Sequence, residues 1–94
     1  MMNEARIEKR LKCETEKIGG KAYKFVSPGM SGAPDRVVLL PGGRMYFVEL
    51  KAPGKTPGPL QLYRSKELKK LGFEIRCIDT IQKVKEFIEE VRKE

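Results

Sequence analysis

The segment from Gly32 to Lys51 reads Gly-Ala-Pro-Asp-Arg-Val-Val-Leu-Leu-Pro-Gly-Gly-Arg-Met-Tyr-Phe-Val-Glu-Leu-Lys, and the organisation of the whole chain follows from it. Two strand-like runs, 37–40 and 45–50, flank the turn-forming tripeptide at 41–43, which predicts a β-hairpin. Because a hairpin folds back on itself, Asp35 near its start is expected close to Glu49 and Lys51 near its end. Alternate residues of a strand share a face, so Glu49 and Lys51 are expected to point the same way.

The length and the apolar runs limit the class of protein. Ninety-four residues are enough for one domain, 1–94, with a modest core. The longest apolar runs are far short of the roughly 20 residues that cross a bilayer, so no membrane partner is expected. The chain starts Met-Met-Asn-Glu-Ala-Arg, which has no apolar signal region, and the expected location is therefore the cytoplasm.

The chemistry available to the chain is narrow. There is no histidine, and Cys13 and Cys77 have no metal-binding or redox spacing, so both thiols are expected to be reduced and structural. A zinc site is close to excluded, and so is a histidine general base or a histidine-containing triad. Carboxylates and lysines remain for any catalysis.

The positive charge is concentrated in the middle of the chain. The net charge is +7, and residues 19–71 hold ten basic and three acidic side chains, whereas the two ends are nearly balanced. This basic segment also contains Asp35 and Glu49. A basic surface around converging carboxylates suits a polyanion that meets the carboxylates through a bound cation, which favours nucleic acid as the partner.

The remaining elements follow from periodicity and turn signals. Helices are expected at 3–18, 60–71 and 80–93, and strands at 21–26, 37–40, 45–50 and 73–78. In the first strand either Ala22, or Tyr23 and Phe25, face the core; the aromatic residues Tyr23, Phe25, Tyr46 and Phe47 are assigned to the core rather than to stacking on single-stranded bases. The middle helix has Leu60, Tyr63 and Leu71 on one face, and Leu62, off that stripe, is a candidate subunit contact.

The order α-β-β-β-α-β-α predicts the topology. Three strands form a meander between helices, and a crossover helix returns the fourth strand parallel to one already in the sheet. The fold class is therefore α/β with a mixed sheet flanked by helices.

The candidate site has the residues that metal-assisted phosphodiester hydrolysis requires. Mg²⁺ prefers oxygen ligands and is commonly held by one or two carboxylates, here Asp35 and Glu49, with the backbone carbonyl of Leu50 between the two side chains on that face. Lys51 would hold the attacking water and stabilise negative charge. Glu4 and Glu8 lie one helical turn apart beside the buried stripe of the first helix, where two solvated glutamates are the alternative interpretation.

The pattern resembles the PD-(D/E)xK nuclease superfamily, and its details resemble the VRR-NUC branch. The motifs that carry the resemblance are Gly32-Ala-Pro-Asp-Arg36, Gly42-Gly-Arg44, Phe47-Val-Glu-Leu-Lys51, Gln61 and Leu71-Gly72, and they span most of the chain. The resemblance implies a restriction-endonuclease-like core and Mg²⁺- or Mn²⁺-dependent cutting of DNA. Stand-alone relatives of this size resemble resolvases that act as homodimers on four-way (Holliday) junctions.

The resemblance also implies roles for single residues. Asp35 and Glu49 would be metal ligands, Lys51 the catalytic lysine, and Gln61 a residue that supports the site or the substrate. The acid of the first helix is either Glu4 or Glu8, since the pattern offers both. Lys24, Arg36 and Lys55 are the expected contacts to DNA.

Other functions remain open at the level of sequence. The chain could instead cut flaps, nicks or other DNA, or bind DNA without cutting it. A non-catalytic module would be expected to lose at least one of Asp35, Glu49 and Lys51, and all three are present.

Overall fold

The structure is a computed structural model that describes residues 3–29 and 31–93. Its elements are α1 (Glu4–Lys17), β1 (Lys21–Lys24), β2 (Arg36–Leu40), a 3₁₀ turn (Pro41–Gly43), β3 (Arg44–Leu50), α2 (Pro59–Lys70), β4 (Glu74–Ile78) and α3 (Ile81–Arg92). The expected order is confirmed, and the expected bounds agree within two residues. The helix starts have the expected chemistry: the side chain of Asn3 caps α1 and that of Thr80 caps α3.

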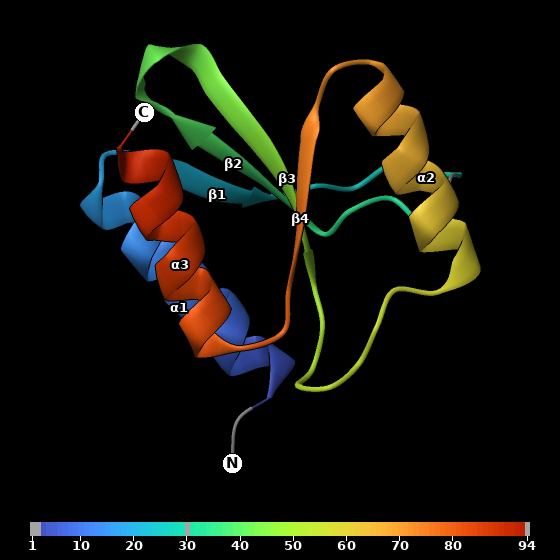
Figure 1. The fold of residues 1–94 in the computed structure, drawn as a ribbon, viewed down its shortest axis with the longest axis horizontal. Coiled ribbons are helices and arrows are strands. Elements are labelled where there is room, and N and C mark those ends of the chain that lie inside the picture. The colour runs from blue at the N-terminus through green and yellow to red at the C-terminus, as the bar shows by residue number, and fades with distance from the viewer. Residues whose placement is uncertain (1–2, 30, 94) are drawn as a thin grey trace.

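The four strands form one sheet in the order β1-β2-β3-β4. β1, β2 and β3 are antiparallel neighbours, and β4 lies parallel to β3 after the crossover through α2 (Figure 1). The hairpin register places Arg36 opposite Val48. The start of β2 therefore lies beside the end of β3, where Glu49 and Lys51 follow. The predicted mixed α/β fold is confirmed.

The hydrophobic core lies between the sheet and two helices. α1 and α3 cover one face of the sheet, and α2 lies on the other side (Figure 1). The core combines helix residues and inward-facing strand residues: Ile7, Leu11, Ala22, Val38, Leu40, Tyr46, Val48, Leu50, Ile78, Val84, Phe87, Ile88 and Val91. On the opposite face, the ring of Phe47 meets those of Phe25 and Phe73 at centroid distances of 5.3 and 5.6 Å.

The burial of residues in β1 shows which side of this strand faces the core. Ala22 is buried, whereas Tyr23 is 54% exposed, so the assignment of Tyr23 to the core was wrong. Among the strands that the structure describes, β1 lies at the edge of the sheet and pairs with β2 alone. Its inner face packs against α1, and Tyr23 points away from that contact.

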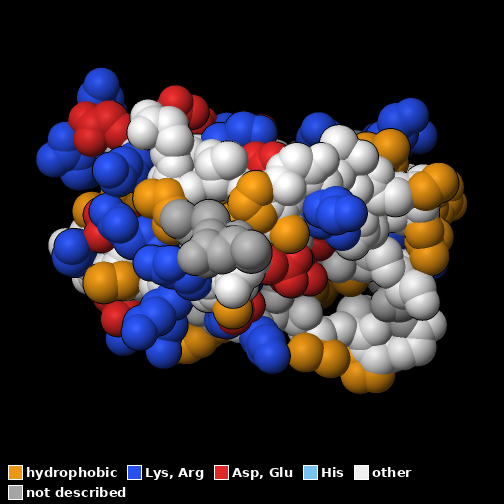
Figure 2. Space-filling model, turned by 90° about the horizontal axis from the view of Figure 1, so that it is seen from below, with side chains coloured by type: hydrophobic (Ala, Val, Ile, Leu, Met, Phe, Trp, Pro, Cys, Tyr) orange, Lys and Arg blue, Asp and Glu red, His pale blue; other side chains and the backbone are white. Residues whose placement is uncertain are grey.

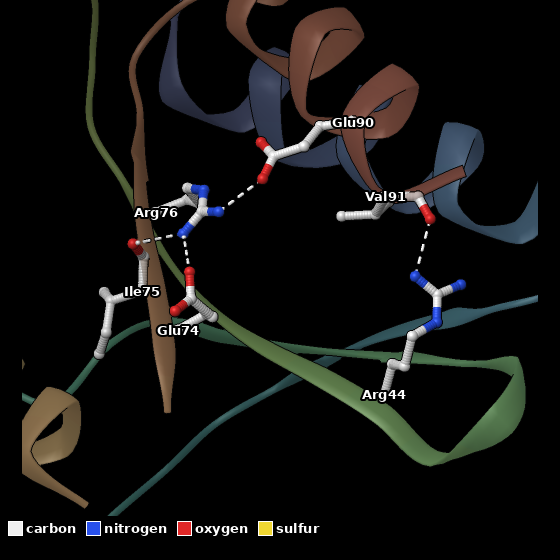
Figure 3. A network of polar contacts seen from close by, with 6 residues as sticks. All are labelled: Arg44, Glu74, Ile75, Arg76, Glu90 and Val91. Atoms are coloured by element: carbon white, nitrogen blue, oxygen red, sulfur yellow. Dashed lines mark hydrogen bonds and ion pairs between the residues drawn. The ribbon is translucent and has the colours of Figure 1, made fainter. Parts of the chain in front are cut away.

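Two arginines, Arg44 and Arg76, hold α3 on the sheet (Figure 3). Arg76 on β4 bonds Glu90 of α3 at 2.6 Å and Glu74 at 2.8 Å. Arg44 at the start of β3 donates to the carbonyl oxygen of Val91 at 2.7 Å. The bonds to Glu90 and Val91 are charge-assisted and join a strand to a helix, so they fix α3 on the core.

α2 is docked differently from the other helices. None of its residues is buried, and Leu60, Tyr63 and Leu71, the expected apolar stripe, are 45, 56 and 73% exposed. The face that these three residues share is therefore not part of the core. The physical reason is that α2 turns its polar side to the sheet, where the side chain of Gln61 bonds the carboxyl group of Glu49.

Gly32 allows the loop before β2 to approach the start of α2. Its φ is +85°, and a Cβ there would stand 2.8 Å from Cγ and 2.9 Å from the carbonyl oxygen of Leu60. Arg64 also donates to the carbonyl oxygen of Ser31 at 3.2 Å. The glycine therefore couples the segment that carries Asp35 to the helix that carries Gln61.

We expect Gly32→Ala to lower the free energy of unfolding by about 2–4 kcal/mol, because backbone strain and a clash with backbone atoms combine. The matched control is Gly42→Ala: Gly42 has a φ of +83° but nothing within 4 Å of the added Cβ. It should lose only about 1 kcal/mol. Urea unfolding of both variants measures the difference, and equal losses would show that the approach to Leu60 does not constrain the fold.

Candidate active site

Asp35 lies where the start of β2 meets the end of β3. Its Oδ2 accepts a hydrogen bond from the backbone N–H of Leu50 at 2.8 Å, and its backbone oxygen accepts one from Phe25 at 2.8 Å. The backbone thus holds Asp35 by one hydrogen bond to its half-buried carboxyl group and by another to its main-chain carbonyl. The hairpin does bring Asp35 and Glu49 together, as the sequence predicts.

Glu49 is a buried carboxyl group with one unused oxygen. Its side chain is on the face of the sheet toward α2, and the residue is only 4% exposed. Oε2 accepts a hydrogen bond from Nε2 of Gln61 at 2.8 Å, while Oε1 is buried and has no hydrogen-bond partner among the described residues. A buried acceptor left in this way is costly unless a further ligand satisfies it.

The surroundings of Glu49 favour its protonated form. Burial is the largest cause, and the neighbouring carboxyl group of Asp35 adds to it, so that the pKa of Glu49 rises to about 8. The positive charge of Lys51 acts in the opposite direction, and the negative charge of Glu4 adds a further rise in this pKa. Asp35, Lys51 and Glu4 therefore all act electrostatically on Glu49 at this end of the sheet.

Gln61 positions Glu49 from α2. The Oε1 atom of Gln61 accepts a hydrogen bond from the backbone N–H of Gly58 at 3.0 Å, which leaves the amide NH₂ to donate to Glu49. One side chain thus caps the start of α2 and orients the carboxyl group of Glu49. The structure thus brings Gln61 onto the carboxyl group of Glu49, and the supporting role that the resemblance implies for it stays a prediction.

Lys51 leaves the end of β3 in a fixed backbone position. Its N–H donates to the carbonyl oxygen of Ile78 at 3.0 Å, which continues the parallel pairing with β4. Its ammonium group is close enough to Glu49 to lower the pKa of that carboxyl group. The lysine therefore belongs to the same cluster of charges.

The two acids of α1 have different surroundings. Both line a hollow of about 430 Å³ with Lys24, Asp35 and Leu50. The carboxylate of Glu8 is bonded to the guanidinium of Arg36, whereas the charge of Glu4 acts on the pKa of Glu49. Of the two candidates, Glu8 is thus engaged by Arg36, and Glu4 is the one whose charge acts on Glu49.

The three residues expected to contact DNA differ in how exposed their side chains are. Lys24 is exposed and lines the hollow beside Asp35, and Lys55 is exposed in the connection between β3 and α2. The side chain of Arg36 is only 13% exposed and faces Glu8. Three of its nitrogens thus bond partners inside the fold, whereas Lys24 and Lys55 are open to solvent.

The residues at this site fit a hard divalent cation. Within the described parts of the chain, no three Asp, Glu, Cys or His side chains form a ready-made metal cage. Mg²⁺ needs no such cage, since it is usually held by one or two carboxylates together with water and substrate phosphate. Asp35 and the unused Oε1 of Glu49 are oxygen donors of that kind.

The sequence did not reveal the bond between Arg36 and Glu8. The two residues are 28 positions apart and belong to different elements, so no helical or strand periodicity links them. The one feature of the sequence that points to this bond is the basic residue directly after Asp35, at the start of β2. Only the packing of α1 on the sheet shows which acid it meets.

Comparisons with known proteins agree with this geometry. None of the protein-family models compared with the chain matches it. The chain is 51% identical over 80 residues to "Putative nuclease p44" of Acyrthosiphon pisum secondary endosymbiont phage 1, covering 85% of this chain and 86% of that protein. A solved structure described as a VRR_NUC domain superposes with a TM-score of 0.87 at 34% identity, covering 95% of this chain and 97% of the other. The chain therefore belongs to the VRR-NUC family of nucleases, within the PD-(D/E)xK superfamily.

Proposed function

We propose that this nuclease is a Mg²⁺- or Mn²⁺-dependent endonuclease that hydrolyses phosphodiester bonds of DNA. The observation that carries the proposal is the buried, unpartnered Oε1 of Glu49 beside the carboxyl group of Asp35. Both carboxylates and the backbone carbonyl of Leu50 would hold the cation. A divalent cation held there supplies Lewis acidity, which stabilises charge on the phosphate and lowers the pKa of a water molecule.

The side chains around the cation have separate tasks. Lys51 orients the attacking water by hydrogen bonding and stabilises negative charge that develops on the phosphate. Gln61 keeps the carboxyl group of Glu49 in place through the 2.8 Å bond. Glu4 adds negative charge at the rim, which raises the local attraction for a cation. Catalysis then depends on groups fixed by backbone pairing rather than by mobile loops.

The charges of α1 support a path for DNA past this site. Counted along the sequence, the first helix is nearly balanced, but in the structure its acids and bases separate: Arg6, Lys9 and Arg10 line a hollow of about 490 Å³ on the side toward α3. Seen from the side where α1 and α3 begin, basic side chains gather over these helices, with acidic ones beside them near the middle (Figure 2). Two further exposed lysines are Lys24, which lines the hollow beside Asp35, and Lys55, which lies in the connection between β3 and α2.

Removing the three charges of this hollow should weaken DNA binding. We expect the triple variant Arg6→Gln, Lys9→Gln and Arg10→Gln to lower the affinity for DNA by about 10–100-fold. The slope of log affinity against log salt should become shallower by about 2–3, because binding with fewer phosphate contacts releases fewer counterions. Fluorescence anisotropy with Ca²⁺ in place of Mg²⁺ measures this. A control that removes Lys17, Lys85 and Lys93 removes the same net charge, and an equal loss there would refute a local contact.

We infer that the active form is a homodimer that cuts four-way junctions. The exposed apolar side chains of α2 support this proposal: Leu60, Leu62 and Tyr63 are 45, 51 and 56% exposed. Beside them lies an apolar hollow of about 530 Å³ that includes Phe25, Leu68 and Leu71. A second copy would cover this surface, and two active sites related by a two-fold axis suit a symmetric junction.

The dimer can be tested without DNA. Sedimentation equilibrium should give twice the mass of the chain for the wild type, and Leu62→Glu should shift the protein to monomer because a charge would be buried at the contact. The matched control is Leu39→Glu, since Leu39 is an exposed leucine on β2. A strictly monomeric wild type at assay concentrations would overturn the dimer.

The activity is tested on a panel of four-way junctions, flaps, nicked duplexes and linear duplexes with Mg²⁺. We expect the junction to be cut fastest, no cutting with EDTA, and loss of cutting in Asp35→Asn. Preference for flaps or nicks would replace the junction with those substrates. Equal cutting by wild type and Asp35→Asn, or DNA binding without any cutting, would overturn the catalytic proposal.

A further inference from the structure

Arg36 and Glu8 form the most enclosed ion pair near the site. Nε and Nη2 of Arg36 both lie on Oε2 of Glu8, at 3.1 and 3.0 Å, and Nη1 donates to the carbonyl oxygen of Ala22 at 3.1 Å. The guanidinium side chain is 13% exposed and that of Glu8 is 34% exposed. One side chain therefore ties together α1, β1 and β2.

The pair lies between the elements that present the proposed cation ligands. Arg36 directly follows Asp35, and its register partner Val48 directly precedes Glu49. Glu8 lies one helical turn after Glu4, a rise of roughly 6 Å along α1. Fixing Glu8 on Arg36 therefore sets how far α1 slides along the sheet, and with it the distance from Glu4 to Asp35 and Glu49.

We propose that Glu8 and Arg36 are positioning residues that hold Glu4 at the cation site, and that neither is a cation ligand or a DNA contact. This inference rests on the proposed function. The planar fork of arginine bonds a carboxylate and a backbone oxygen at once, which fixes direction as well as distance. A contact of this kind supports a metal site from outside the ligands themselves.

The other roles conflict with the geometry. As a cation ligand, Glu8 would have to share its carboxylate with a guanidinium that already bonds it twice. As a phosphate contact, Arg36 would have to turn away from the half-buried carboxylate of Glu8 and the carbonyl of Ala22. Leaving these two acceptors without their donor costs more free energy than an exposed salt bridge to a phosphate returns, and exposed lysines can form that salt bridge without this cost.

Arg36→Met separates these roles, because it keeps the carboxylate of Glu8. We expect calorimetric titration with Mn²⁺ to show about a tenfold loss of affinity, since Glu4 is no longer held in place. If Glu8 were a ligand, removing its competitor would leave Mn²⁺ affinity unchanged or raise it, and that result would overturn the proposal. Arg36→Lys keeps the positive charge but not the planar guanidinium group, and its affinity for Mn²⁺ should fall by a smaller factor.

A matched variant tests for a merely structural effect. Arg76→Met breaks a similar bond between a strand and a helix on the same face of the sheet, but its helical partner lies on α3 rather than on α1 (Figure 3). It should lower the melting temperature while leaving Mn²⁺ affinity within twofold of wild type. If Arg36→Met and Arg76→Met both lower the melting temperature and neither changes Mn²⁺ affinity, Arg36 only stabilises the fold and the proposal is wrong.

DNA binding gives a readout independent of the cation. With Ca²⁺ in place of Mg²⁺, Arg36→Met should bind junction DNA within twofold of wild type and with the same salt slope, whereas a phosphate contact would lower the slope by about 1. The double variant of Glu8→Gln with Arg36→Met should be no worse than Arg36→Met alone in Mn²⁺ affinity. Wild type that binds no Mn²⁺ would overturn the proposed function and this inference together, while equal Mn²⁺ binding by wild type and Arg36→Met would overturn the inference alone.

Discussion

Lys51→Met should lower single-turnover cleavage of DNA by about 10³-fold while binding of Mn²⁺ and DNA remains. Methionine keeps most of the length of the side chain but removes the ammonium group that would hold the attacking water and stabilise the developing charge. Loss of a positioned donor of this kind commonly costs 10²–10⁴-fold. Because the charge of Lys51 also lowers the pKa of Glu49, Mn²⁺ affinity at neutral pH should fall slightly as well.

The experiment compares cleavage and binding in the same variant. Quenched-flow cleavage with enzyme in excess gives the chemical step, and calorimetry gives Mn²⁺ affinity. Lys85→Met on the exposed side of α3 is the control for loss of one positive charge, and it should cut at the wild-type rate. Cleavage by Lys51→Met within tenfold of wild type would remove the lysine from the catalytic role.

The parts of the site that lie on one hairpin could be predicted from the sequence. Turn residues at 41–43 and alternation along 45–50 determine how the two strands return on each other, so the approach of Asp35 to Glu49 follows from local rules. The parallel direction of β4 follows too, since a helix between two strands implies a parallel crossover, whereas its place beside β3 was left open. These inferences need only neighbours in sequence.

Contacts between distant elements could not be predicted in this way. Helix periodicity put Leu60, Tyr63 and Leu71 on one stripe but could not show that the opposite, polar side of α2 meets the sheet. That orientation depends on the buried carboxyl group of Glu49, which attracts the amide of Gln61. The choice between Glu4 and Glu8 likewise depends on how α1 lies over Arg36, which is a property of packing.

The metal-free protein should become less stable as the pH rises from about 5 to 8. The pKa of Glu49 is about 8 in the folded protein, against a normal value of 4.5. Between these values the folded state binds the proton and the unfolded chain releases it, so each increase in pH favours unfolding. We expect the free energy of unfolding to fall by roughly 1–3 kcal/mol across this window.

Glu49→Gln should remove that dependence on pH and abolish cleavage at the same time. An amide is a close match for the protonated acid and cannot ionise, so the metal-free variant should be more stable than wild type at pH 8, although its Mn²⁺ affinity falls by at least tenfold. Urea unfolding with EDTA at pH 5, 6, 7 and 8 measures the first effect. Glu16→Gln, an exposed change on α1, is the control for loss of one negative charge and should keep the wild-type dependence on pH.

The other shifted acids do not act in the same window. The pKa values of Glu14, Asp79 and Glu89 are lowered by their lysine or arginine partners, so these groups change stability below pH 4.5. Burial raises the pKa of Cys77 above its usual 9.0, which places its titration above the window. A wild-type stability that stays flat or rises between pH 5 and 8 without metal would therefore show that Glu49 is ionised in the folded protein. A saturating divalent cation should reverse the loss at pH 8 in wild type, because the cation binds the carboxylate and takes the place of the proton.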